Sequence, residues 1–344
     1  MDPISTNACY PQNTSRLDDT NHPPPPETSA TVTTPKRSDG CVRDDTPDAD
    51  GCPKWVCANR YDFDAHVQAT VVSPELFARN SPSDVDDITP ADVRQNQMGD
   101  CHLMATLSAL AGTPQGRALI RNAIAENRDA QGQVVSYSVA LYERRPTPLG
   151  SALGRVKDLD KELGAEAVDA HHTLSRVTVT VDGKYACGHA TAPESDKGTH
   201  EVWPVVLEKA IAQASGGYDA INGGSLSHRS MEMLTGQPAS FHSLTSAWSP
   251  LRIVPGTYAP SDISAAVAAG KLVVLNTKPT LGSQGQATPY GLQSEHAYSV
   301  AQIVTVNGTP CALLRNPWGR GDPQPIPLDK LPDFFAGACV GSVN

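Results

Sequence analysis

Apolar residues are unevenly distributed along the chain. Residues 1–53 are crowded with Pro, Ser, Thr, Asp and Asn and hold almost no large apolar side chains, so they cannot form a core. Apolar residues become frequent only between Tyr61 and Phe77. The pattern predicts a disordered acidic tail over residues 1–65 and a folded domain over residues 66–344.

The first half of the folded domain has mainly helical patterns. The segment DCHLMATLSALA is rich in helix formers and predicts a buried helix that starts at Cys101, with Asp100 as its N-cap. Further helices are expected from Pro114 to about Glu126 and from Trp203 to about Ala214. Alternating residues between these helices predict two strands, 134–141 and 176–181.

Beyond residue 250 the pattern changes to strands. The runs KLVVLNT, HAYSVAQIVTV and CALLRNP are β-branched or alternating, and Asn307-Gly308 is a strong hairpin signal between the last two. The residues after Gly319 indicate a final strand and a short helix. We therefore predict an α+β fold with a helical lobe over residues 66–240 and a strand lobe, mainly antiparallel, over residues 241–344.

Negative charge is concentrated near the N-terminus. The formal net charge is -10, and residues 1–87 carry 15 acidic against 7 basic side chains, which leaves the remainder close to neutral. No basic surface for nucleic acid is expected.

The sequence contains no export or membrane signal that we can identify. No apolar run approaches the roughly 18 residues of a membrane span, and the start lacks the basic-then-apolar pattern of a signal peptide. We expect a cytoplasmic monomer. The polar tail suits a solvated linker or leader; a second hypothesis is a bacterial effector, exported by an apparatus that reads unfolded N-termini and delivered into a host cell.

The eight cysteines are scattered over the whole length, and a chain of this size needs no disulfide staples. We expect free thiols and a reducing compartment. The closest pair, Cys52 and Cys57, has no matching Cys or His pair nearby, so no zinc site is predicted.

Three residues form a candidate catalytic set. Cys101 stands at a predicted helix N-terminus, where free amide groups and the helix dipole stabilise a thiolate. His296 begins the strand that enters the hairpin and Asn316 ends the strand that leaves it, so antiparallel pairing returns both to one end of the ladder. An imidazole that serves a thiol needs a group that fixes its orientation, which an asparagine amide provides. The alternative is that all three have structural roles only: a buried cysteine, a strand-end histidine and a turn asparagine before Pro317.

Two further residues have weaker signals. The side-chain amide of Gln95 and the backbone amide of Cys101 could donate to an oxyanion, although Gln95 reads equally well as a polar loop residue. Trp318 could shield a His296–Asn316 hydrogen bond from water, or it could be a core tryptophan.

The sequence resembles the calpain protease core. Five blocks stand in the order and rough spacing of that family: QNQMGDCHLMATLSAL, VWPVVLEKAIAQASGGYDAINGGS, EMLTG, EHAYSV and LLRNPWG. The resemblance covers about residues 85–320, and the short chain is similar to compact bacterial members. It implies a papain-like fold, limited intracellular cleavage of protein substrates, and catalytic roles for Gln95, Cys101, His296 and Asn316.

The sequence departs from the family pattern at two positions. His102 replaces the aromatic residue usual after the nucleophile, and Glu295 replaces the glycine usual before the histidine. His102 is an alternative base, but adjacent helical residues diverge by about 100°. Animal calpains bind Ca²⁺ in this core, yet no acidic loop here matches residue by residue, so no metal site is assigned and Ca²⁺ rests on the resemblance alone.

Three other functions compete with peptide hydrolysis. The same residues could transfer an acyl group to an amine or act on an isopeptide bond. A catalytically silent binding module would retain the fold, although no member of the set is missing. A metal-bound hydrolase is disfavoured because the sequence has no HExxH motif.

Overall fold

The computed structural model of the chain describes residues 42–47, 53–56, 67–71, 73–79, 84, 86–153, 172–193, 195, 198–244, 258–279, 281 and 289–343. Within the predicted tail it describes two strands, β1 (Val42–Pro47) and β2 (Pro53–Val56), which pair antiparallel. The rest of the prediction for residues 1–65 lies outside the described residues.

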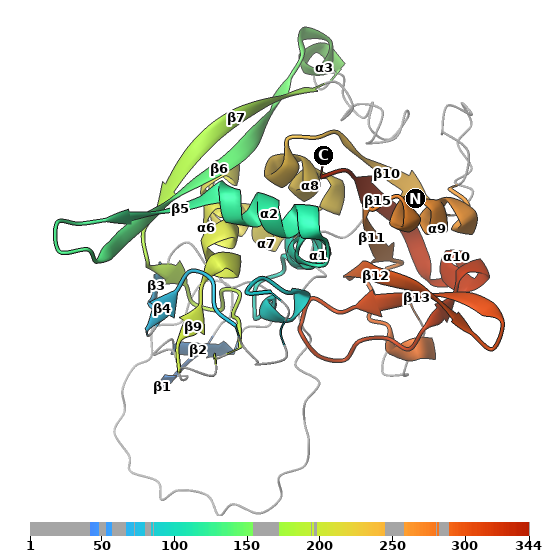
Figure 1. Cartoon of the computed structure of the whole chain (residues 1–344), viewed down its shortest axis with the longest axis horizontal. Coiled ribbons are helices and arrows are strands. Elements are labelled where there is room, and N and C mark those ends of the chain that lie inside the picture. The colour runs from blue at the N-terminus through green and yellow to red at the C-terminus, as the bar shows by residue number, and fades with distance from the viewer. Residues whose placement is uncertain are drawn as a thin grey trace, which may run out of the picture.

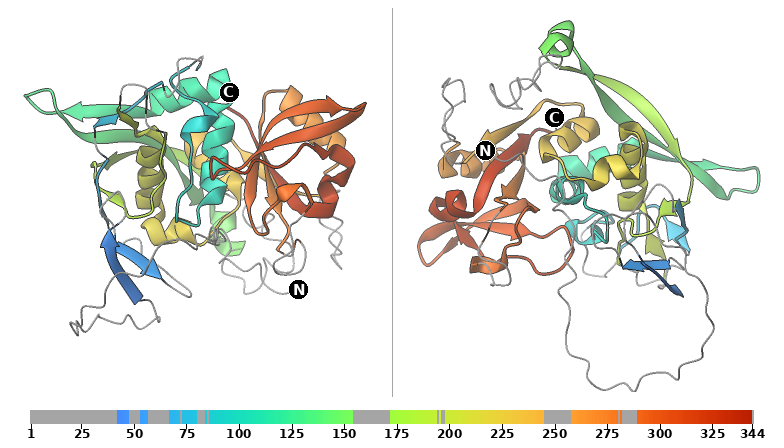
Figure 2. Two further views of the ribbon diagram at one scale, coloured as in Figure 1. Left: turned by 90° about the horizontal axis from the view of Figure 1, so that it is seen from below. Right: turned by 180° about the vertical axis from the view of Figure 1, so that it is seen from behind.

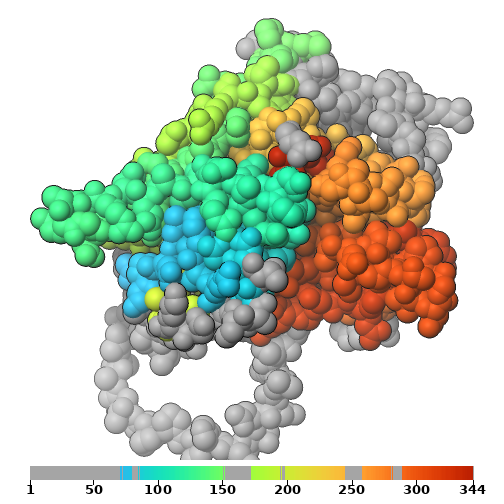
Figure 3. Space-filling view, in the orientation of Figure 1, coloured from blue at the N-terminus to red at the C-terminus, as the bar shows by residue number. Residues whose placement is uncertain are grey.

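Helices and antiparallel sheets are combined in two lobes, as the α+β prediction requires (Figure 1). The space-filling view shows the orange and red C-terminal strands as one mass beside the blue, green and yellow elements (Figure 3). The same division is visible from two other sides (Figure 2). The helices of the first lobe are α1 (Cys101–Ala111), α2 (Pro114–Ala123), α3 (Pro148–Leu153), α6 (Trp203–Ser215), α7 (Tyr218–Asn222) and α8 (Ser227–Thr235).

Helix α1 is the central element of the molecule. All of its side chains are buried, because α2 and α8 pack on it from one lobe and strands of the other lobe pack on it too. Its bounds agree with the prediction. Asp100 occupies the predicted N-cap position, although its side chain makes no capping hydrogen bond. Helix α2 ends three residues earlier than expected because the chain turns into a strand at Ile124.

A three-stranded antiparallel sheet extends the first lobe. Its order is β5-β6-β7, and the two strands predicted from alternation are both longer than expected. Arg144 of this sheet and Glu232 of α8 form an ion pair, with Nε and Oε2 2.6 Å apart, and Nε2 of His172 lies 3.0 Å from the same oxygen. This cluster fixes the sheet to the helices. The strand bounds are β5 (Ile124–Arg128), β6 (Val134–Pro146) and β7 (His172–Val181).

The second lobe is built on a six-stranded antiparallel sheet in the order β10-β15-β11-β12-β13-β14. The predicted hairpin joins β12 and β13, and both Asn307 (φ 50°) and Gly308 (φ 80°) have the positive φ values of a tight turn. The last strand, β15, returns to the middle of the sheet. The bounds are β10 (Ala239–Ser243), β11 (Leu272–Thr277), β12 (Ala297–Val306), β13 (Thr309–Arg315), β14 (Ile326–Pro327) and β15 (Phe335–Gly341), with helices α9 (Pro260–Ala268) and α10 (Leu331–Phe334).

Strand β11 explains how the lobes share a core. Leu272 and Val274 belong to the buried apolar cluster that surrounds α1, whereas Val273 and Leu275 belong to the cluster on the opposite face, with α9. Successive side chains of a strand point to opposite faces, so a strand buried on both sides reads as a continuous apolar run. This two-sided burial accounts for the sequence KLVVLNT.

Short elements complete the described structure. They are β3 (Val67–Ala69) with β8 (Tyr185–Ala186), β4 (Pro74–Glu75) with β9 (His200–Glu201), and the 3-10 helices η2 (Pro90–Asp92), η3 (Pro289–Gly291) and η4 (Leu328–Lys330). In the part of the chain that the structure describes, no helix has the length and apolar character needed to cross a bilayer.

Candidate active site

Cys101 is the first residue of α1 and is 2% exposed. Its sulfur is engaged in a disulfide, and so is that of Cys187, which follows β8. The expectation of free thiols is therefore wrong at both positions, because spacing along the sequence does not report which cysteines the fold brings together. A disulfide sulfur is not a thiolate, so the structure represents an oxidised form of the site.

The backbone of His296 is fixed by Thr277 at the end of β11. The amide of His296 donates to the Thr277 hydroxyl (2.8 Å), and the amide of Thr277 donates to the His296 carbonyl (2.9 Å). These bonds continue the β11–β12 ladder to its last residue. The preceding Glu295 has φ 50°, a left-handed conformation that glycine adopts at lower cost. The glycine usual in the family at this position therefore has a conformational reason.

His296 and Asn316 are joined by a hydrogen bond of 3.0 Å between Nε2 and Oδ1. The amide of Trp318 also donates to this Oδ1 (3.1 Å), which identifies the atom as the oxygen. Nε2 of His296 must then carry the proton, and in a neutral imidazole Nδ1 is left as the acceptor. That nitrogen is the one able to take a proton from a thiol.

Asn316 is itself held by the loop that follows it. Its backbone amide donates to Oδ1 of Asp322 (2.8 Å), and its Nδ2 approaches the carbonyl of Gly321 (3.4 Å). These contacts and the Trp318 amide fix the side chain in one orientation. The asparagine therefore has the rigidity required of a group that aligns an imidazole.

Aromatic rings enclose His296. The ring centroid of Trp318 lies 4.7 Å away, and that of Tyr298 lies 4.9 Å away at an interplanar angle of 89°. Burial lowers the pKa of His296 to about 4, against the opposing effect of the Asn316 hydrogen bond. In this state the imidazole is neutral at pH 7. Trp318 therefore lies against His296, and its role in shielding the hydrogen bond stays a prediction.

Gln95 connects the two sides of the site. Its backbone amide donates to the carbonyl of Pro317 (2.7 Å), the residue after Asn316, and its Nε2 donates to the carbonyl of Met98 (2.7 Å). The side chain is 6% exposed, so it is not the solvated loop residue of the alternative interpretation. Close packing supports this contact, because a Cβ added at Gly319 would lie 2.7 Å from Cγ of Arg94.

The structure brings the cysteine helix and the histidine strand into contact. Helix α1 packs against β12, and Ala297 lies in the same buried apolar cluster as Cys101. Within the described part of the chain, the side-chain hydrogen bond of His296 goes to Asn316, and none joins it to Cys101. The sulfur of Cys101 is in a disulfide, which is consistent with the absence of a hydrogen bond to His296.

His102 lies apart from the catalytic set. It is 4% exposed, and burial, together with the charge of Arg229 in α8, lowers its pKa to about 4. The side chain therefore faces α8 rather than His296, as expected from the angle between adjacent helical residues.

Sequence reasoning missed a pair of buried carboxyl groups beside the cysteine. Asp100 and Glu208 are fully buried and interact through their carboxyls, and Glu208 also accepts from the amide of Ala190 at 3.0 and 3.1 Å. Burial raises the pKa of Asp100 to about 7, and burial and the Asp100 charge raise that of Glu208 well above its ordinary value. The two carboxyls are therefore not both ionised at neutral pH. A lone glutamate inside the apolar run WPVVLEKAIA was the signal available in the sequence.

In the described ranges, no group of three His, Cys, Asp or Glu side chains lies close enough together to hold a metal ion. Among the described residues, the Ca²⁺ implied by the resemblance therefore has no such donor set.

A two-lobed α+β fold, with a cysteine opening a buried helix and a histidine–asparagine pair at the end of a facing sheet, is the arrangement expected of a cysteine protease. The family model described as "Calpain family cysteine protease" matches residues 151–324, half of the chain. The matched range contains His296 and Asn316 and begins after Cys101. The chain belongs to the calpain family of cysteine proteases.

The individual relatives that the chain matches are similar to it at modest identity and over part of their length. Calpain-A of Drosophila melanogaster is 26% identical over 265 residues, covering 75% of this chain and 27% of that protein. The calpain-1 catalytic subunit of Sus scrofa is 28% identical over 252 residues, covering 72% and 30%, and calpain-8 of Homo sapiens is 35% identical over 145 residues, covering 41% and 19%. The chain therefore spans less than a third of the length of these relatives.

Proposed function

We propose that this chain is a cysteine endopeptidase that cleaves protein substrates, with Cys101 as nucleophile, His296 as base and Asn316 as the residue that orients the imidazole. The observation that carries the proposal is the hydrogen bond from Nε2 of His296 to Oδ1 of Asn316. It leaves Nδ1 as the acceptor on a buried ring.

Reduction of the Cys101 disulfide precedes catalysis. A thiol reductant of the dithiol class gives up two electrons and two protons and becomes a disulfide, while Cys101 and its bonded partner regain thiols. The Cys101 thiol then transfers its proton to Nδ1 of His296. The N-terminus of α1 stabilises the resulting thiolate.

Acylation follows by attack of the thiolate on a peptide carbonyl. The side-chain amide of Gln95, which donates to Met98 and also bonds to the Asp100 carboxyl, and the backbone amide of Cys101 are the donors proposed for the tetrahedral oxygen. His296 protonates the leaving amine and then takes a proton from the water that hydrolyses the thioester. Asn316 and Trp318 keep the imidazole aligned and dry in both halves of the reaction.

Active-site titration tests the proposal. The reduced wild type and its Cys101→Ala variant are treated with an epoxysuccinyl peptide, with and without Ca²⁺, and analysed by intact mass. One adduct on the wild type and none on the variant is expected. Labelling only with Ca²⁺ would show that the ion assembles the site. Cleavage of a protein substrate by the Cys101→Ala variant would overturn the assignment of the nucleophile.

A further inference from the structure

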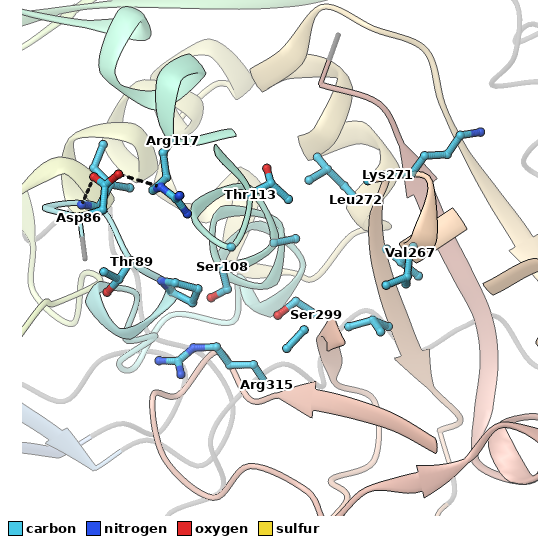
Figure 4. A pocket seen from close by; sticks show the side chains of 18 of the residues that line it. Asp86, Thr89, Ser108, Thr113, Arg117, Val267, Lys271, Leu272, Ser299 and Arg315 are labelled. Atoms are coloured by element: carbon cyan, nitrogen blue, oxygen red, sulfur yellow. Dashed lines mark hydrogen bonds and ion pairs between the residues drawn. The ribbon is translucent and has the colours of Figure 1, made fainter. Parts of the chain in front are cut away.

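A cavity of about 420 Å³ lies between the two lobes, away from the catalytic cysteine. Its walls are the C-terminal half of α1, the loop before η2, strands β11 and β12, and the end of β13 (Figure 4). Ser108 on α1 and Ser299 on β12 both line it and lie near each other (Figure 4). Ser108 is seven helical residues from Cys101 and Ser299 three strand residues from His296, about 10 Å in each case.

Two polar groups in this wall are buried without a hydrogen-bond partner in the described structure. Ser108 is 2% exposed, and its Oγ makes no hydrogen bond, either to the preceding helical turn or to another side chain. Nε of Arg315 is likewise buried and unpaired, and burial lowers the pKa of its guanidinium. Buried polar groups in native proteins nearly always have partners, so each such exception calls for one.

The charges around the cavity favour a negative partner. The cations in its wall are Arg117, Lys271 and Arg315, and Arg117 is paired with Asp86 through Nε and Oδ2 at 2.9 Å. The wall then holds two further cations, Lys271 and Arg315, and one further acidic residue, Asp84.

Two more carboxylates act on Arg315 from a distance. Asp92 and Asp322 favour its charged form, but Asp92 accepts from the amide and the hydroxyl of Thr89 at 2.5 and 2.9 Å, and Asp322 accepts from the Asn316 amide. Each carboxylate therefore already accepts a hydrogen bond from a backbone amide, and Asp92 accepts one from a hydroxyl as well. Neither accepts a hydrogen bond from Nε of Arg315, whereas a bound oxyanion would accept one from the guanidinium and one from a serine hydroxyl.

We propose that this interlobe cavity binds a small oxyanion of the phosphate class, held by the Arg315 guanidinium and the hydroxyls of Ser108 and Ser299. Arg315 is bonded in sequence to Asn316, and Ser108 lies on the helix that begins at Cys101. The bound anion therefore bridges the helix that carries the nucleophile and the strand that carries the orienting asparagine. This coupling rests on the proposed function; the binding does not.

The binding is tested by the thermal unfolding of the full chain, measured in inorganic phosphate and in chloride of equal ionic strength. A saturable rise of the unfolding temperature in phosphate is expected for the wild type and for Arg320→Gln, which alters an exposed arginine outside the cavity. Arg315→Gln is expected to weaken the apparent affinity about tenfold or more. Equal shifts for Arg315→Gln and Arg320→Gln, or no shift in the wild type, would overturn the site.

Ser108→Ala provides a second test that does not depend on the arginine. Because the hydroxyl is unpaired without the anion, its removal should raise the unfolding temperature in chloride and reduce the phosphate-induced rise. The matched control is Thr106→Ala on the same helix, whose hydroxyl donates to the His102 carbonyl at 2.8 Å; it should lower stability and leave the phosphate response intact. The opposite pattern would show that Ser108 is purely structural.

The coupling is read from the rate at which an epoxysuccinyl peptide labels Cys101 in the reduced protein. Phosphate should change this rate in the wild type and in Arg320→Gln but not in Arg315→Gln. An unchanged rate in a protein that binds phosphate would reject the coupling alone. Absence of any labelling would reject the proposed function, while the unfolding measurements would still decide the anion site.

Discussion

The backbone amide of Gln95 donates to the carbonyl of Pro317 at 2.7 Å, which joins the segment before the nucleophile to the segment after Asn316. The two lobes therefore meet at the site through a main-chain bond. One contact therefore links the proposed oxyanion donor to the segment of the proposed imidazole-orienting residue.

Gln95→Ala is expected to lower kcat by about 10²–10³-fold with little change in KM, because an oxyanion donor acts on the transition state. Steady-state kinetics on a peptide substrate measures the effect. The control is Gln97→Ala, an exposed neighbour whose backbone amide bonds to Gly188. A loss confined to KM would assign Gln95 to substrate binding instead.

Asn316→Ala should reduce kcat by about 10²-fold, because the imidazole loses the acceptor that sets its tautomer. The variant should still fold, since the six-stranded sheet does not depend on this side chain. Asn307→Gly, at the hairpin turn, serves as control because glycine accepts its positive φ. Equal activity of the two variants would remove Asn316 from the mechanism.

Cys101 and Cys187 should resist alkylation until a reductant is added, because both sulfurs are in disulfides. Peptide mapping after differential alkylation measures this, and it also identifies the bonded partners. Cys311, a buried free thiol, is an internal control that should be alkylated on denaturation with or without reductant. Modification of Cys101 in the untreated native protein would contradict the prediction.

The Asp100–Glu208 pair should make stability fall as pH rises. Above pH about 4 an unfolded carboxyl has lost its proton, but folded Asp100 keeps it up to pH about 7. The folded state therefore binds more protons in this window, and raising the pH favours unfolding. His296 acts in the opposite sense, since its folded pKa of about 4 lies below the ordinary 6.5.

Glu208→Gln separates these two effects, because a glutamine supplies the shared hydrogen at every pH and can still accept from Ala190. When the free energy of unfolding is measured with denaturant between pH 4 and 8, the loss of stability that the pair causes with rising pH should be smaller in the variant than in the wild type. The difference should reach a few kcal/mol. Asp333→Asn, at an exposed side chain, should leave the wild-type profile unchanged.

Glu232→Gln is expected to destabilise the chain by about 3 kcal/mol, because it leaves Arg144 largely buried without its carboxylate. Glu143→Gln breaks an exposed pair with Arg145 on the same strand and should change stability by less than about 1 kcal/mol. Denaturant unfolding of both variants measures the contrast. Similar losses would mean that the buried pair is not the anchor of the β6–β7 sheet.

The sequence was sufficient for elements whose signals are local. The start of α1 at Cys101 follows from composition and flanking glycines, and the β12–β13 hairpin follows from Asn307-Gly308, so the relation of His296 to Asn316 could be anticipated. The place of β15 in the middle of the sheet could not, because pairing between distant strands leaves no periodic signal.

Most features of the site that the sequence could not predict depend on long-range contacts, and one depends on the conformation of a loop. Glu208 lies more than a hundred residues from Asp100, and Asp322 holds Asn316 from within a glycine-containing loop. The resemblance to calpains supplied Gln95, but only the structure gives its bond to Pro317. The disulfides of Cys101 and Cys187 are likewise invisible to spacing arguments.

The engaged sulfur of Cys101 also determines how this protein would be encountered experimentally. Surveys that tag nucleophilic cysteines in untreated cell extracts score enzymes by their free thiolates, and a site in this oxidised form would be recorded as silent. The same extract, treated first with a reductant, would yield a tagged peptide that begins a wholly buried helix. A peptide that is tagged only in the reduced sample would therefore allow the protein to be identified and isolated.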